Sequence, residues 1–572
     1  MSINIVKEIY KKSLIERTNK EEVVRYFNEH QDKLSPVRKD KIKTFLKNYN
    51  KALKILDDYL SSNEDVKNVK FYFSSEVFGY GHTLIETILK ENKNKLKFNI
   101  EANKKNKESN LIETNEIEHS KGRYLDKDSI LFITSAQNNT PVHKKFLVNL
   151  LAYKEYIEKT TKRKVEIVVI PFRYKNPTSV FLDKKYEKWE KSLYPYLFMR
   201  KQVINDYYIL GDVKVQPTAQ NPLSNLTQLG LGNNVIVAHT KQHLKMIPHS
   251  SGPKIAVTTG AITVLNYTDS KIGKQGEFNH IYGFVYLDVK NRIVRLVSAE
   301  NNGNFQDVDV YVSKGFIKRG KIECIVLGDI HYGSENVEVY NKSIEFIQKY
   351  RIPNIVLHDI FDAKSISHHH DNLILKQYQK MERRLTLEEE LELVTNEIIK
   401  LHDRLKFKKN IYVVRSNHDE HLDRWLNKFV KDYNILNLKQ LSILFVLMTD
   451  KNRVEGSLAE YLKFRLINLN RKDILKSVIF LERRDIVKIK GWLISQHGDI
   501  GINGSKGSLA QFKKLSDKII IGHTHSPFRV NNVASVGCIQ DKNADYLKGI
   551  NTWEYANVII LGNGKIQHIF IN

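Results

Sequence analysis

The sequence predicts an α/β protein (of the α+β kind), in which a helical N-terminal segment precedes a mixed α/β domain and a C-terminal layered sheet domain. Three observations support this. The first 64 residues carry apolar side chains at helical spacing, strand-like and helix-like runs alternate after them, and 572 residues exceed one ordinary domain. We therefore expect domains at residues 1–64, 65–320 and 321–572.

The first expected domain, 1–64, is helical throughout. Apolar residues recur every three or four positions in EEVVRYFNEH and in KIKTFLKNYNKALKILDDYL, and Ser35-Pro36 predicts a helix start between them. Two short basic helices leave two interpretations open, a helix-turn-helix or a plain helical cap.

The middle region, 65–320, begins with a polar stretch at 92–121 that predicts an exposed insertion or a long hairpin. A helix is expected in HKKFLVNLLAYKEYIEKT. Strands are expected in SILFITSA, KVEIVVIPF, NNVIVAHT, KIAVTTGA, HIYGFVYLDV and RIVRLVSAE. No repeat is visible. A basic hinge, GFIKRGK at 315–321, leads into the last region.

The last region, 321–572, alternates strands and helices. The run is strand KIECIVLGDI, helix VEVYNKSIEFIQKY, strand NIVLHDIF, a long helix near 373–406 and strand NIYVVRSN. Successive β-α-β units predict a layered sheet whose functional residues lie at the carboxyl ends of its strands.

The charge balance points to a polyanionic partner. The chain holds 91 Lys and Arg against 65 Asp and Glu, a net charge of +26, of which +18 falls within residues 1–320. Such a surplus favours nucleic acid, here DNA, as the partner. The alternative is an AT-rich genome, whose codons enrich lysine everywhere.

The compartment and the redox state are also predicted. The N-terminus lacks the apolar core of a signal peptide, and the longest apolar run, Leu441 to Met448, is far too short to span a membrane. Cys324 and Cys538 lie in apolar surroundings and are expected to be buried and reduced. We expect a soluble cytoplasmic protein with no membrane partner.

Five apolar strands end in residue types that bind metal ions. A strand turns its side chains to alternate faces, so Asp-x-His and His-x-His each place two ligands on one side. Any one pair is weak evidence, but five in order are not expected by chance. The residues are Asp329, His331, Asp359, Asp362, Asn417, His418, His497, His523 and His525.

This ordered series resembles the calcineurin-like metallophosphoesterase superfamily, over about residues 321–572. The resemblance implies a β-sandwich flanked by helices, with two divalent ions at the strand ends. One ion would be held by Asp329, His331 and His525, the other by Asn417, His497 and His523, and Asp359 would bridge them. The mixed donors suit Mn²⁺, Fe²⁺ or Zn²⁺ better than Mg²⁺. We expect two ions, with Mn²⁺ first.

The mechanism follows from the two ions. With both ions bound, a metal-bridging hydroxide would attack phosphorus in line, without a covalent intermediate. His418, beside a ligand but not itself one, is placed to protonate the leaving oxygen as general acid. Asp362 resembles the family's partner for this histidine, and an outward-facing loop position is the alternative.

Two departures from the family pattern concern glycine. His358 and Ser416 stand where glycine commonly precedes the bridging aspartate and the Asn-His pair, which puts the local backbone geometry in question. No ligand position is lost. Three cations, Arg415, Arg424 and Lys506, are candidate contacts to the substrate phosphate, with ordinary surface charge as the alternative.

The order of motifs, with a long excursion at 420–490, resembles SbcD-type repair nucleases, and above all their phage-encoded members. This implies a Mn²⁺-dependent DNase in the bacterial host cytoplasm that acts on host DNA, and a homo-oligomer, since related nucleases self-associate. Two alternatives stay open. One is a phosphatase acting on phosphoproteins or nucleotides, favoured by Asp362; the other is a DNA-binding scaffold whose metal site is only structural.

Overall fold

The computed structural model describes residues 2–16, 18–61, 75–80, 82–91, 111–113, 123–177, 179, 188–366, 386–428, 437–451, 455–542 and 549–571. These form two compact units, 1–111 and 112–572. The polar insertion expected at 92–121 lies outside the described residues, except for residues 111–113. The long helix expected near 373–406 is described only from residue 386 onward.

The N-terminal unit is helical, as predicted. Its elements are α1 (Ser2–Tyr10), the π-helix η1 (Lys11–Ile15), α2 (Lys20–His30), α3 (Pro36–Lys47), α4 (Tyr49–Ser61), α6 (Ser75–Phe78) and α7 (His82–Glu91). Helix α3 begins at Pro36, the predicted start, where the missing N–H of proline costs no hydrogen bond. Phe78 and Ile85 share a core with Tyr10 and Phe45, so this unit continues past residue 64.

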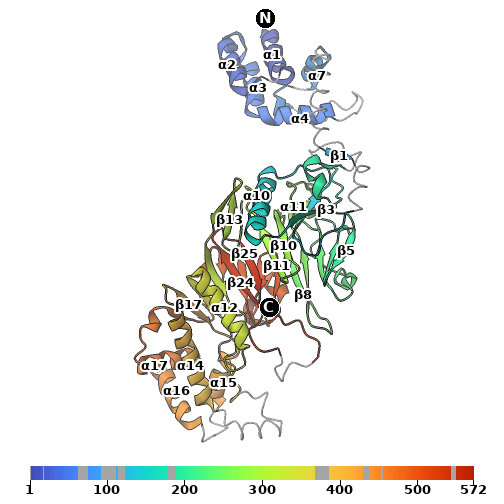
Figure 1. Cartoon of the computed structure of the whole chain (residues 1–572). Helices are drawn as coiled ribbons and strands as arrows, with labels where there is room; N and C mark the ends of the chain where they lie inside the picture. The colour runs from blue at the N-terminus through green and yellow to red at the C-terminus, as the bar shows by residue number, and fades with distance from the viewer. Residues whose placement is uncertain are drawn as a thin grey trace. The chain divides into compact units, whose positions relative to one another are not determined.

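The unit at 112–572 confirms the α/β class (Figure 1). We call residues 123–319 its first half and residues 321–571 its second half. In the first half, β11 (Ile293–Ser298), β10 (Gly283–Asp288), β2 (Ile130–Gln137) and β3 (Val165–Phe172) form one sheet in this order. Helix α10 (Lys144–Thr161) packs on it through Phe146, Leu150 and Tyr153.

The second half holds a six-stranded sheet in the described residues. Its order is β18 (Val478–Leu481), β17 (Asn410–Val414), β16 (Asn354–Leu357), β15 (Ile322–Val326), β24 (Ala556–Leu561) and β25 (Ile566–Phe570). The strands from β15 to β18 run parallel, and β24 is antiparallel to β15. This sheet packs on α12 (Val337–Tyr350), α14 (Leu387–Arg404) and α17 (Ser457–Asn468).

A ten-stranded sheet joins the two halves. Its order is β19 (Lys488–Ile489), β20 (Trp492–Leu493), β21 (Lys518–Ile521), β23 (Val533–Ser535), β22 (Phe528–Val530), β8 (Leu244–Ile247), β9 (Lys254–Thr258), β7 (Asn234–Val237), β6 (Tyr207–Leu210) and β5 (Lys201–Ile204). The expected boundary at 320/321 therefore lies between two regions that share one sheet.

The remaining elements lie around these sheets. A meander of β12 (Phe305–Asp307), β13 (Val310–Ser313) and β14 (Phe316–Arg319) ends the first half. The excursion after β17 forms α15 (Asp419–Lys428), α16 (Leu438–Asp450) and α17. Shorter elements are β4 (Lys188–Glu190), α11 (Lys271–Phe278) and α18 (Leu509–Phe512).

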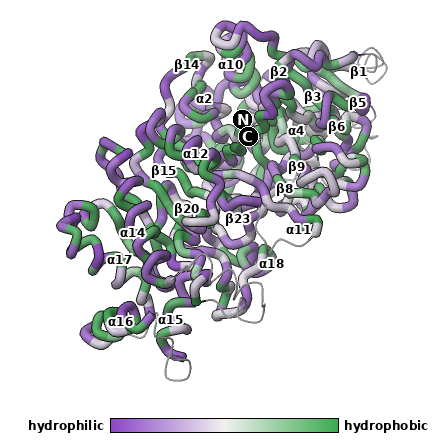
Figure 2. Tube along the Cα trace, turned by 60° about the horizontal axis from the view of Figure 1, so that its bottom comes forward, coloured by the Kyte–Doolittle hydropathy of each residue, from purple (hydrophilic) through white to green (hydrophobic). Residues whose placement is uncertain are grey.

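Figure 2 shows the hydropathy of each residue along the chain, and the strands β2, β7 and β24 are buried over their whole length. The two sheets of the second half share an apolar core, in which Val326 and Val356 of one meet Ile520 and Ala534 of the other. No helix in the described parts of the chain has the length and hydrophobicity needed to cross a lipid bilayer.

Candidate metal centre

The six-stranded sheet delivers one group of predicted ligands. Asp329 and His331 follow β15, Asp359 follows β16, and Asn417 follows β17. Since these three strands are parallel neighbours, their carboxyl ends meet at one edge of the sheet. The backbone joins the ends directly, because the His331 N–H donates to the carbonyl of Asp359 at 2.7 Å.

The ten-stranded sheet delivers the other group. His497 lies four residues after β20, and His523 and His525 follow β21, its parallel neighbour. The Gly522 N–H donates to the carbonyl of His497 at 2.7 Å, which holds these two strand ends together. The two packed sheets thus present all their ligand-type residues along a common edge.

The expected first ligand set is assembled. His525 Nε2 lies 3.1 Å from Asp329 Oδ2, and the rings of His331 and His525 have centroids 5.3 Å apart. All three side chains are buried. His331, His525 and the expected bridging residue Asp359 offer ligand atoms within 4.8 Å of one another, close enough to hold one ion.

The expected second set also comes together. His497 Nε2 lies 3.1 Å from Asn417 Oδ1, and its ring centroid is 5.2 Å from that of His523. Asp359 lies between the two sets, with Oδ2 at 3.1 Å from His497 Nε2 and 3.6 Å from His331 Nε2. Asp359 is therefore within reach of residues from both expected sets.

The pKa values reflect this crowding. Burial raises the pKa of Asp359, but His497, His418 and His331 outweigh burial and hold the pKa well below its ordinary value. Burial lowers the pKa of His497, yet Asp359 raises it to about 9. The pocket therefore stabilises an ionised carboxylate at its centre.

Several buried polar atoms at this edge lack a hydrogen-bond partner among the described residues. They are Asp329 Oδ1, His331 Nε2, Asp359 Oδ1 and His525 Nδ1. Unpaired buried polar groups are costly and uncommon, and these belong to residue types that bind divalent ions. The residues present therefore fit a metal centre.

The backbone at the site is in an unusual conformation. His331, Asp359, His523 and His525 have φ of 53°, 46°, 66° and 54°, in the left-handed region that favours glycine. Such conformations cost about 1–3 kcal/mol each, and persist where the surrounding structure imposes them, often at functional sites. Four of the seven expected metal ligands adopt it.

His418 and Asp362 lie against the first ligand set. His418 Nδ1 is 3.1 Å from the main-chain oxygen of Asp362 and 3.8 Å from its Oδ1. The carboxylate is buried, so the outward-facing alternative for Asp362 is wrong. Its nearest imidazole is that of His331, whose Nδ1 lies 3.3 Å from Oδ1, so Asp362 contacts an expected ligand as well as the candidate acid.

Sequence reasoning missed three groups that complete this corner. Lys364 Nζ lies 3.1 Å from Asp362 Oδ2, and Ser334 Oγ donates to the same oxygen at 2.7 Å. The ring of half-buried Trp553 lies tilted by 55° against that of His525, with ring centroids 4.0 Å apart. Only Lys364 had a signal in the sequence, as a cation two residues after a candidate carboxylate.

His358, noted only as a departure from glycine, is buried within the site. Its Nδ1 lies 3.3 Å from His497 Nδ1, and it forms a ligand-type group with Asp329 and His497. A glycine is needed at position 522 instead, because a Cβ added to Gly522 would lie only 2.3 Å from Asp329 Oδ1. Ser416, the other departure, caps α15 instead, since its Oγ accepts from the Asp419 N–H at 3.2 Å.

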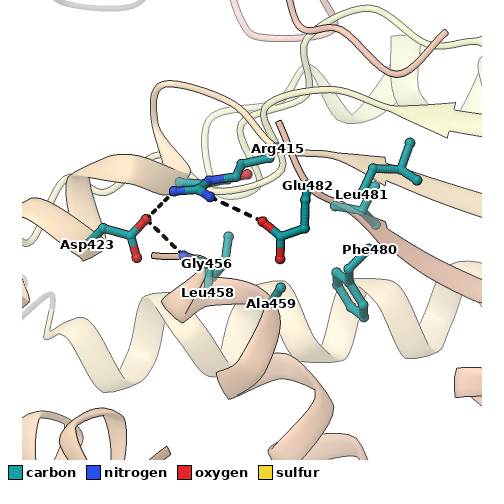
Figure 3. A pocket seen from close by; sticks show the side chains of 10 residues that line it. Arg415, Asp423, Gly456, Leu458, Ala459, Phe480, Leu481 and Glu482 are labelled. Carbon is teal, nitrogen blue, oxygen red and sulfur yellow. Dashed lines mark hydrogen bonds and ion pairs between the residues drawn. The ribbon is translucent and has the colours of Figure 1, made fainter. Parts of the chain in front are cut away.

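Arg415 is buried among carboxylates, which does not favour the expected phosphate contact. Its guanidinium lies 2.8 Å from Asp423 and 3.2 Å from Glu482, and it turns toward both of them (Figure 3). Asp423 also accepts from the Gly456 N–H at 3.1 Å. This network ties β17, α15 and α17 together.

The other two candidate contacts are exposed. Arg424 donates from Nη2 to the main-chain oxygen of Asn417 at 3.1 Å, so it lies beside a ligand. Lys506 lies on the glycine-rich loop after His497, where the Gly507 N–H donates to the carbonyl of Asp499 at 2.7 Å. No contact of Lys506 with the site is recorded among the described residues.

No family model matches the chain. It is 25% identical over 459 residues to "Protein A1" of Escherichia phage T5, covering 76% of this chain and 80% of that protein. A solved structure with 10% identity covers 44% of this chain and 98% of its own, but its TM-score of 0.22 is too low to indicate a shared fold. The chain is therefore similar to a phage protein.

Proposed function

We propose that this chain is a metal-dependent phosphodiesterase that hydrolyses DNA, of the metallophosphoesterase type. The observation that carries the proposal is the position of Asp359, 3.1 Å from His497 and 3.6 Å from His331, where one carboxylate serves both ligand sets. Two divalent ions, Mn²⁺ first, would be held by Asp329, His331 and His525 and by Asn417, His497 and His523. When bound, such ions lower the pKa of water and neutralise charge on phosphoryl oxygens.

The residues of the chain supply the rest of the reaction. Burial lowers the pKa of His418, but Asp359 and Asp362 outweigh burial and raise it, which favours the imidazolium form of a general acid. The Asp362 carboxylate contacts the Nδ1 atoms of both His418 and His331 and would orient their rings. Lys364, with a side chain 40% exposed, offers a cation at the same corner.

DNA is favoured as substrate by two further observations. A net charge of +26 suits a partner with a repeating phosphate backbone. The likeness to a phage protein is compatible with action on nucleic acid in a bacterial host, where the protein would work in the cytoplasm. A homo-oligomer and the absence of a membrane partner remain part of the proposal.

The test is incubation of linear and circular DNA with Mn²⁺, with EDTA as the metal-free control. We expect cleavage with Mn²⁺ only, and a fall of about 10²–10⁴-fold in His418→Ala. His402→Ala is the matched control, because His402 lies on α14 and contacts Asp403. Metal-independent cleavage, or an unchanged rate in His418→Ala, would contradict the proposal.

A phosphatase is the second candidate, favoured by the contact between Asp362 and His418. The aryl substrates bis(p-nitrophenyl) phosphate and p-nitrophenyl phosphate separate the two, since a diesterase prefers the first. A third outcome, salt-sensitive DNA binding that Asp359→Ala leaves unchanged and no cleavage of any substrate, would indicate a scaffold with a structural metal site.

A further inference from the structure

The two halves repeat the same first sheet. In the second half, β16 and β15 are parallel, β24 is antiparallel to β15, and β25 forms a hairpin with β24. In the first half, β3 and β2 are parallel, β10 is antiparallel to β2, and β11 forms a hairpin with β10. Helix α10 follows β2 as α12 follows β15, and the hairpins β10–β11 and β24–β25 lie close together in Figure 1.

The shared ten-stranded sheet repeats in the same way. From its outer edge inward, the second half contributes β19, β20, β21, β23 and β22, and the first half contributes β5, β6, β7, β9 and β8. In each series the second, third and fourth strands are parallel, and the first and last are antiparallel to their neighbours.

Single residues correspond as well. Isolated parallel bridges join Asp329 to Cys538 and Cys538 to Tyr555 in the second half. In the first half, Ser135 pairs with Ala261 and Ala261 with Tyr282 in the same manner. Where the halves meet, Arg529 of β22 pairs with Leu244 of β8. Those two residues occupy equivalent places, opposite Ala534 and Val257. Antiparallel pairing of equivalent residues is what a local two-fold axis produces.

We propose that the first half is a second, metal-free copy of the fold that carries the metal centre, so that each chain has one such centre. The strand registers assign the equivalent positions. Asp329, His331 and Asp359 correspond to Ser135, Gln137 and Ile170, and Gly522-His523-Thr524-His525 corresponds to Ala238-His239-Thr240-Lys241.

These replacements remove the chemistry of the site. Both carboxylates are gone, one histidine has become a glutamine, and Lys241 brings a positive charge to the place of a ligand. A divalent ion needs anionic or neutral donors, so a lysine there opposes its binding. Among these equivalents of candidate ligands, only His239 keeps the residue type of its counterpart, His523.

In the first half, the residues at the equivalent positions contact loops of that same half. His239 Nε2 lies 3.0 Å from the main-chain oxygen of Gln216, and Lys241 Nζ donates to the carbonyl of Ala219 at 2.7 Å. Gln137 Nε2 donates to the carbonyl of Asn266 at 2.8 Å. His239 and Lys241 are 1% and 3% exposed, so the loop closes the position that would be an open site.

The test compares equivalent residues in the two halves of the full-length chain. We measure the number and affinity of bound Mn²⁺ by equilibrium dialysis, together with Tm, in His523→Ala and His239→Ala. His523→Ala should weaken Mn²⁺ binding about 10-fold or more. His239→Ala should leave the number and affinity of bound ions unchanged, lower Tm, and make the loop at 216–219 more sensitive to protease.

The outcomes separate this inference from the proposed function, on whose metal centre it rests. Weaker Mn²⁺ binding in His239→Ala, or a Mn²⁺ anomalous signal within the first half of a soaked crystal, would overturn the metal-free copy. Unchanged binding in His523→Ala would instead count against the metal centre of the second half. If His239→Ala does not fold, Lys241→Met and His525→Ala form the second pair, with the same expectations.

Discussion

The two halves of the larger unit share an order of strands and differ at the ends of those strands. The second half gathers Asp329, Asp359 and His525 into a buried edge, where some of their polar atoms have no hydrogen-bond partner within the part of the chain that the structure describes. The first half has Ser135, Ile170 and Lys241 at the equivalent places. The same order of strands therefore forms with different side chains at these places. The comparison teaches that the strand framework supports a site but does not specify one.

The largest expected difference lies at Asp359 and its counterpart Ile170. Asp359→Asn removes the charge shared by the two ligand sets, and should lower Mn²⁺-dependent DNA cleavage by about 10³-fold, the upper range for losing one electrostatic group at a reaction centre. Ile170→Val should leave cleavage within about twofold and cost about 0.5–1.5 kcal/mol of stability. Initial rates and urea unfolding measure the two effects; equal losses of activity would break the comparison.

A stability effect of similar size is expected at a buried ion pair of the first half. The Asp307 carboxylate accepts from Arg295 Nε and Nη2, both at 2.7 Å, and from the Tyr153 hydroxyl at 2.6 Å. Asp307→Ala leaves the Arg295 charge buried and unpaired, and should cost about 3–5 kcal/mol. Urea unfolding measures this loss of stability, and the folded fraction should cleave DNA at an unchanged rate. A loss below about 1 kcal/mol would show that water solvates the Arg295 guanidinium in the variant.

The next largest difference between the halves is expected at Gly522 and its counterpart Ala238. Gly522→Ala would push a Cβ against Asp329 and His358, so Mn²⁺ affinity should fall about 10–100-fold. Ala238→Gly, the reverse change at the equivalent place, should cost at most about 1 kcal/mol of stability, and Mn²⁺ affinity should not change. Dialysis and thermal unfolding distinguish the two; a Gly522→Ala protein with normal affinity would show that Asp329 can shift.

The pH dependence of the unfolding free energy should differ between the wild type and a variant that lacks the Asp307 carboxylate. Burial raises the pKa of Asp307, but Arg295 outweighs burial and holds the pKa below its ordinary value of 3.8. The stability that this carboxylate contributes is therefore fully present above the unfolded pKa and is lost as pH falls through the folded one. The difference in unfolding free energy between the wild type and Asp307→Asn should be constant from pH 7 to 5, and shrink below about pH 4.

The smallest expected effect belongs to the rim of the metal centre. Arg424→Ala should raise the KM for DNA a few-fold, keep kcat, and lower the salt slope of binding by about 1, as the loss of one phosphate contact would. Arg415→Ala, a charge-matched control, should lower stability instead, because Asp423 and Glu482 lose their ion pairs with the guanidinium. Equal salt slopes in wild type and Arg424→Ala would remove Arg424 from the interface.

Much of the centre was predictable from the sequence because strand ends are local features. The run Asp-x-His after KIECIVLG and the run Gly-His-Thr-His after KIII place ligands by the alternation of a strand and the parallel order of the sheet. The helix start at Pro36 was predictable for the same reason. The role of Arg415 was not, because its carboxylates come from α15, from the strand β18 region and from the residues before α17.

The amino-acid sequence by itself determined the α/β class, the helical beginning and the residue types available for a metal centre, since each depends on periodicity or on neighbours along the chain. Only the tertiary structure decided that Asp362 faces inward, that His358 belongs to the site, and that the first half repeats the second. The sequence shows no visible repeat because strand order and register tolerate nearly any apolar residue, while most of the candidate ligand positions carry different residues in the two halves.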